Sequence, residues 1–181
     1  MKANRFPAIA ACLLCVLPAA AGSLKVDKAK SRIQVDAKAT GHAFTGTLSD
    51  YDIDVDGDES SLTPSAVKLD WEFSKLKTGE KKRDQEMIKW LGGGGPVGSF
   101  KFDKSWDAKG TKYAQGTLSI HGVSKTISFP YTATKDGDWV TIDGTATMNY
   151  EDFKLPVIST MLVMKVDPQL AIRFHLVGRV N

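Results

Sequence analysis

Cysteine is almost absent from this chain of 181 residues, which contains 2, Cys12 and Cys15, both near the N-terminus. A small scaffold stapled by disulfides is therefore excluded for the rest of the chain, and a zinc site built on cysteine is disfavoured. The remaining body of about 160 residues must be held together by its core and hydrogen bonds, which is feasible at that length.

A large excess of charge of either sign is also missing. The chain has 24 Lys and Arg against 21 Asp and Glu, and two of the basic residues, Lys2 and Arg5, lie in the N-terminal segment. Without that segment the net charge falls from +3 to +1. A nearly neutral surface lacks the basic field that attracts phosphate backbones, so we expect no nucleic-acid partner.

The apolar stretch Phe6–Leu17 is shorter than the roughly 20 residues that a membrane-spanning helix needs, and it ends at Pro18. It follows the two basic residues and precedes the small residues Ala19–Ala21, which is the pattern of a cleaved export signal. We predict a signal peptide over residues 1–21, one domain over 22–181, and no stable membrane span.

Beyond Ser31, apolar residues alternate with polar ones, the period of a half-buried strand. The clearest runs cover residues 67–73, 140–148 and 170–176. Turn-forming pairs separate the runs, at Asp56-Gly57, Lys109-Gly110, His121-Gly122 and Asp136-Gly137. These short separations predict an all-β fold of about eight antiparallel strands that close into a barrel or form a sandwich.

Two places interrupt the alternation. The apolar positions change from even to odd numbers near Ser49-Asp50, which predicts a β-bulge or bend. One short helix is predicted over Glu80–Leu91, with Thr78 as its cap and Gly92 as its stop. The glycines that follow, residues 92–95, make either a lid loop at a barrel mouth or a simple crossover.

No motif specifies a metal or a reaction. Asp52–Gly57 matches the first half of a calcium loop, but Thr63 stands where the bidentate glutamate belongs, so exposed aspartates on a strand explain the run better. The histidines His42, His121 and His175 form no metal-binding pair, and no Gly-x-Ser-x-Gly elbow is present. We therefore expect no metal and no cofactor, and catalysis is disfavoured although triads assemble from distant positions.

The segment 115–125, which reads Gln-Gly-Thr-Leu-Ser-Ile-His-Gly-Val-Ser-Lys, resembles the most recognisable stretch of the YceI-like family. Segments 44–48, 76–84 and 152–153 resemble further landmarks of that family in the same order, so that the resemblance covers roughly 25–180. It implies an extended lipocalin-like barrel, exported to the periplasm, whose interior accepts a long apolar chain such as a polyisoprenoid or fatty-acyl compound.

The chain departs from the family pattern in two segments. Trp90-Leu91 and four glycines follow the helix, where relatives carry two phenylalanines and a Tyr-Pro. Lys154 stands where the family's Asp-Phe-Gly motif has its glycine. Both changes fall where we expect the mouth of a pocket.

Our leading hypothesis is a non-catalytic carrier or sequestering protein for such a lipid. Arg83 and Asp84 are candidates to hold the helix to the barrel or to touch a headgroup. The apolar candidates for the lining are Trp71, Phe73, Met87, Trp90, Phe100, Phe102, Phe129, Met148, Phe153 and Phe174. An enzyme acting on a similar lipid and a packed barrel that binds a protein partner are the alternatives, and the oligomeric state, including a homodimer, is left open.

Overall fold

The structure, a computed structural model, describes residues 21–160 and 164–180. The predicted export signal therefore lies outside the described residues, apart from Ala21. The strands are β1 Ala21–Val26, β2 Arg32–Ala39, β3 His42–Leu48, β4 Asp52–Asp58, β5 Thr63–Glu72, β6 Leu76–Lys77, β7 Val97–Ala108, β8 Thr111–Ile120, β9 Val123–Asp136, β10 Trp139–Asn149, β11 Ser159–Thr160, β12 Met164–Lys165 and β13 Gln169–Val180. The helices are η1 Phe73–Lys75, α1 Lys81–Trp90 and η2 Tyr150–Phe153.

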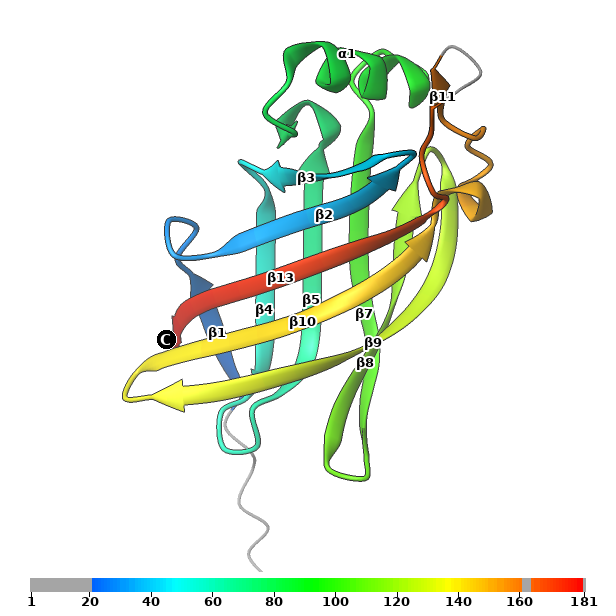
Figure 1. Ribbon diagram of the computed structural model, residues 1–181. Coiled ribbons are helices and arrows are strands. Elements are labelled where there is room, and N and C mark those ends of the chain that lie inside the picture. The colour runs from blue at the N-terminus through cyan, green and yellow to red at the C-terminus, as the bar shows by residue number, and fades with distance from the viewer. Residues whose placement is uncertain (1–20, 161–163, 181) are drawn as a thin grey trace, which may run out of the picture.

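Eight of these strands form a closed antiparallel barrel within the described part of the chain (Figure 1). Neighbours pair in the order β1-β4-β5-β7-β8-β9-β10-β13, and β13 returns to β1 through Leu24↔Val180. The predicted all-β barrel of about eight strands is confirmed. Closure leaves this ring without an open edge that could pair with another chain.

Strand β13 pairs with β10 along one edge and with two successive partners along its other edge. Residues 171–175 of β13 pair with β2, and residues 178–180 pair with β1. In the same way β3 pairs with β2, whereas β4 pairs with β1. The two segments β1–β2 and β3–β4 thus each behave as one strand with a sharp bend, and the bend predicted near Ser49-Asp50 is confirmed.

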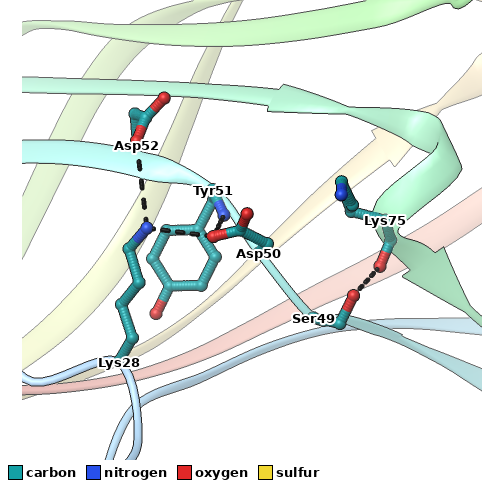
Figure 2. A network of polar contacts seen from close by, with 6 residues as sticks. All are labelled: Lys28, Ser49, Asp50, Tyr51, Asp52 and Lys75. Carbon is teal, nitrogen blue, oxygen red and sulfur yellow. Dashed lines mark hydrogen bonds and ion pairs between the residues drawn. The ribbon is translucent and has the colours of Figure 1, made fainter.

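A polar network ties these two bends together (Figure 2). The Nζ atom of Lys28, between β1 and β2, lies 3.0 Å from the Asp50 carboxylate and 3.8 Å from that of Asp52. The hydrogen bond with Lys28 lowers the pKa of Asp50 and raises the pKa of the lysine. Ser49 Oγ donates to the carbonyl of Lys75 at 2.8 Å. All these groups are solvated, so the network fixes geometry more than it adds stability.

Three of the four predicted hairpin turns are confirmed, the one at Asp136-Gly137 to within one residue. The turn at Asp56-Gly57 was wrong, because this pair lies inside β4 at a shift in strand register and the chain turns at residues 59–62. The reason is Asp58, whose carboxylate accepts hydrogen bonds from Ser60 Oγ and the Ser61 amide, both at 2.6 Å. An aspartate bonding the backbone a few residues ahead defines where a turn forms.

Helix α1 lies over one end of the barrel (Figure 1). It is one residue shorter at each end than predicted, and Thr78 does not cap it, because Thr78 Oγ1 donates to Asp84 at 2.6 Å instead. The predicted stop is confirmed: Gly92 has φ +93°, and the next amide bonds the Ile88 carbonyl at 2.9 Å. No helix in the described residues is long and apolar enough to cross a membrane.

A candidate ligand cavity inside the barrel

The barrel encloses a cavity of about 1060 Å³. One boundary, which we call the α1 end, includes Met87 and Trp90 of α1; the other, the β4–β5 end, includes Leu62 and Thr63. In Figure 1, α1 lies at the top and the turn between β4 and β5 lies at the bottom. The volume is at the upper limit of ordinary ligand pockets, roughly 300–1,000 Å³. The apolar residues of the inward strand faces therefore line a space as well as pack against one another.

The wall between the two ends is apolar because strand alternation turns one side chain in two inward. On β10, for example, Ile142, Ala146 and Met148 line the cavity, whereas Asp143, Thr145 and Thr147 are exposed on the outer face. Charged side chains of the described lining occur only at the ends. They are Lys82, Arg83, Lys89, Glu80 and Glu86 at the α1 end, and Asp56, Asp58 and Glu59 at the β4–β5 end.

Nine of the ten predicted apolar candidates border the cavity, namely Trp71, Phe73, Met87, Trp90, Phe100, Phe102, Phe129, Met148 and Phe174. Their contact with a ligand stays a prediction. Phe153 was wrong as a lining residue, because it is 1% exposed within the largest apolar cluster and does not border the cavity. Strand β10 ends at Asn149 and the chain coils into η2, so alternation no longer decides where Phe153 points. Lys154 ends η2 with φ +59°.

Arg83 and Asp84 both attach α1 to the chain just before it. Asp84 accepts hydrogen bonds from the amide of Thr78 at 2.9 Å and from its hydroxyl at 2.6 Å, and it does not border the cavity. Arg83 Nη2 donates to the Thr78 carbonyl at 2.9 Å, and its guanidinium lies 4.4 Å from the centre of the Phe44 ring. Arg83 does border the cavity, so a headgroup contact is a prediction for Arg83 alone.

The other end of α1 is attached to the segment after η2. Trp90 Nε1 donates to the Pro156 carbonyl at 2.8 Å, and the Trp90 ring packs edge-on against Tyr150, with centroids 5.2 Å apart. Tyr150 in turn donates to the Val166 carbonyl at 2.8 Å and accepts from the Ile158 amide at 3.3 Å. Burial raises the pKa of this tyrosine.

Sequence reasoning missed the contribution of this segment to the cavity. Leu155, Val157, Ile158 and Val166 all border the cavity at its α1 end. They follow no strand or helix period that would mark them in advance. The only signal in the sequence is the concentration of apolar residues itself, in a stretch between two better-defined elements.

The structure does not bring the three histidines together. His42 borders the cavity at its α1 end beside Phe44, with ring centroids 6.2 Å apart. His121 occupies the exposed turn between β8 and β9. His175 pairs with Asp143 on the outer face, with its Nδ1 atom 2.7 Å from the carboxylate.

A closed antiparallel barrel with a hollow apolar interior and one helix over its end defines a lipocalin-like barrel protein. The model of the YceI-like domain matches residues 24–178, and the chain belongs to the YceI-like family. No curated protein matches the chain.

Two solved structures show the same fold. BcnA from Burkholderia cenocepacia is 20% identical with a TM-score of 0.72, and the alignment covers 85% of this chain and 99% of that chain. A Campylobacter jejuni YceI protein is 19% identical with a TM-score of 0.61, and the alignment covers 74% of this chain and 83% of that chain. At such identities the likeness shows the fold alone.

Proposed function

We propose that this chain is a non-catalytic periplasmic protein that carries or sequesters one long apolar molecule, of polyisoprenoid or fatty-acyl type, inside its barrel. The observation that carries the proposal is the cavity of about 1060 Å³, whose wall is apolar between two charged ends. An eight-stranded barrel has room for one small ligand when its inward side chains do not fill it. Membership of the YceI-like family supports the proposal.

The hydrophobic effect supplies the affinity. Each methylene moved from water into an apolar site contributes about 0.8 kcal/mol. A chain of ten carbons therefore gains roughly 8 kcal/mol, which is comparable to the several kcal/mol that association costs. Because the wall has little to offer a polar group, longer chains gain affinity until the cavity is full.

The charged ends favour one orientation of the ligand. The α1 end carries three basic and two acidic lining residues, whereas the charged lining of the β4–β5 end is entirely acidic. A carboxylate or phosphate headgroup is attracted by the basic residues of α1, whereas at the β4–β5 end Glu59 is paired with Lys135 and Asp56 and Asp58 repel an anion. We therefore place the headgroup at the α1 end, with Arg83 as the nearest contact, and the apolar tail toward the β4–β5 end.

Both alternatives fit the interior less well. A packed barrel that uses only its outer face has no need of a cavity of this size. An enzyme acting on a lipid needs reactive polar groups beside the bound chain, whereas the charged lining residues sit at the two ends and the histidines at three separate places. Replacing His42, His121 and His175 one at a time tests the enzyme: loss of turnover in any of them would favour it.

The direct test is the content of the cavity. Protein purified from its own host is analysed by native mass spectrometry and by solvent extraction. We expect one apolar compound for each chain, released on unfolding. A protein that emerges empty, and that after delipidation takes up neither hexadecanoate nor a polyisoprenoid alcohol, would overturn the proposal.

A further inference from the structure

Aromatic rings and glycines alternate around half of the barrel interior. Moving from strand to strand through β7, β8, β9, β10 and β13, the wall presents Phe100, Gly116, Phe129, Gly144 and Phe174. The centroids of Phe100 and Phe129 are 5.9 Å apart, and those of Phe129 and Phe174 are 5.5 Å apart. The three phenylalanines therefore form one continuous girdle across five strands, and the two glycines lie beneath its outer members.

Each glycine is covered by the tip of a ring. A methyl group added to Gly144 would lie 2.2 Å from Cζ of Phe174, its partner in strand register. One added to Gly116 would lie 2.2 Å from Cζ of Phe100. The same arrangement occurs between β5 and β7, where a methyl group on Gly98 would lie 2.2 Å from Cζ2 of its register partner Trp71.

The rings therefore occupy the space that side chains at these positions would fill, and they lie along the wall. The rings of Trp71, Phe100 and Phe174 border the cavity, whereas the three glycines that they cover do not. Carbon atoms in contact are normally about 3.5–4.0 Å apart, so even an alanine at one of these glycines forces the ring away. The backbone of the neighbouring strand blocks movement of the ring toward the outside of the barrel, so the ring can move only into the cavity.

Resting on the function proposed above, we propose that Gly98, Gly116 and Gly144 are specificity-determining positions that set the bore of the cavity. By letting Trp71, Phe100 and Phe174 lie flat, they leave a channel for a long chain. Any larger residue at these positions turns a ring inward, narrows the channel and shortens the chain that fits.

Two of the three glycines allow a clean test. The three atoms nearest to a methyl group at Gly144 or at Gly98 all belong to a ring, which can rotate away. At Gly116 a methyl group also meets the backbone carbonyl of Lys101 at 2.6 Å, so that substitution disturbs the sheet itself. The control is Thr145→Ala at the neighbouring position of β10, because the Thr145 side chain is exposed on the outer face of the barrel.

The experiment combines crystal structures with competition binding, using octanoate and hexadecanoate to displace a dansyl-labelled fatty acid. In Gly144→Ala we expect the Phe174 ring in the cavity and about a tenfold loss of hexadecanoate affinity, equivalent to roughly two methylenes left unburied. Octanoate affinity stays unchanged, and Thr145→Ala behaves as the unaltered protein. The double variant Gly144→Ala/Phe174→Leu regains hexadecanoate binding.

The proposal is overturned if the Phe174 ring stays on the wall in Gly144→Ala, or if both acids weaken equally. If the unaltered protein binds neither acid, the proposed function fails, but the ring position in the Gly144→Ala crystal still decides whether glycine sets the bore. If Gly144→Ala does not fold, Phe174→Leu alone gives the answer. It must improve binding of the branched acid phytanate more than that of hexadecanoate, and equal changes would contradict the proposal.

Discussion

The wall of the cavity and its α1 end follow different structural rules. The wall consists of strands whose apolar inner faces and polar outer faces come from a two-residue period. The α1 end is made of a helix, a 3₁₀ helix and irregular chain, and hydrogen bonds such as those of Trp90 and Asp84 hold it together. On the proposed function, we therefore expect affinity to depend on the wall, and access and headgroup preference to depend on the α1 end.

The largest effect is expected from filling the wall. Ala146 is 3% exposed and borders the cavity, whereas its neighbour Thr147 is exposed on the outer face of β10. We expect Ala146→Phe to weaken hexadecanoate binding about 100-fold, since the ring takes the place of several methylenes. Competition binding measures the affinity, and chemical denaturation measures stability.

The control is Thr147→Phe, which adds the same ring outside the barrel and leaves binding unchanged. Because Ala146→Phe fills existing space, its free energy of unfolding stays within about 1 kcal/mol of the original, in contrast to overpacking of a filled core, which costs typically 1–3 kcal/mol. Strong destabilisation without loss of binding would show that the interior is packed.

At the α1 end, Trp90→Ala should act on the rate of exchange more than on affinity. It removes the bond to the Pro156 carbonyl and the contact with Tyr150, so the covering elements separate more easily. We expect about a tenfold faster release of a fluorescent fatty acid in stopped flow, as for a loss of about 1.4 kcal/mol in the barrier. Trp90→Phe keeps the ring packing, so its release rate should fall between those of the unaltered protein and Trp90→Ala. An unchanged release rate in both variants would mean that the ligand enters the cavity elsewhere.

A smaller effect is expected from Asp84→Ala, which breaks both hydrogen bonds to Thr78. Hydrogen bonds to charged groups contribute about 1.5–3 kcal/mol, and the partial exposure of this site reduces the expected loss in stability to about 1 kcal/mol. Gln85→Ala, at an exposed neighbouring position of α1, is the control for helix propensity. Urea denaturation measures the free energy of unfolding of both variants. An equal decrease in both would contradict the prediction.

The smallest effect concerns the turn at the β4–β5 end. Hydrogen bonds from Ser60 and Ser61 lower the pKa of Asp58 from 3.8 to about 2. Because the folded value is the lower one, the stabilising contribution is complete above pH 3.8 and is lost as the pH falls toward about 2. Asp58→Asn should reduce the acid sensitivity of the urea midpoint in this window, and an identical pH profile would contradict the account.

Sequence periodicity predicts the wall well, because burial on one face of a strand leaves a pattern in single residues. Nine of ten apolar candidates border the cavity, and six of these nine lie on strands, where this pattern marks them. Phe153 fails at the point where β10 gives way to η2. The Asp56-Gly57 turn fails because a local contact, from the Ser61 amide to the Asp58 carboxylate, decides where the chain turns.

Features that depend on pairs of distant residues were beyond the sequence alone. The two successive partners of β13, the bond from Trp90 to the chain after η2, and the rings resting on glycines all join segments far apart in the chain. A glycine on a strand signals a close approach of some kind, but not which ring approaches it. These contacts between distant residues decide whether large apolar side chains fill the barrel or line a cavity in it.

The central claim is that the apolar wall buries a long chain, and titration calorimetry of the delipidated protein with hexadecanoate at several temperatures tests it most directly. Burial of apolar surface on binding gives a negative heat-capacity change. We predict one site per chain, with a clearly negative heat-capacity change that shrinks in Ala146→Phe and not in Thr147→Phe. Absence of saturable binding, or a heat-capacity change equal in the two variants, would contradict the account.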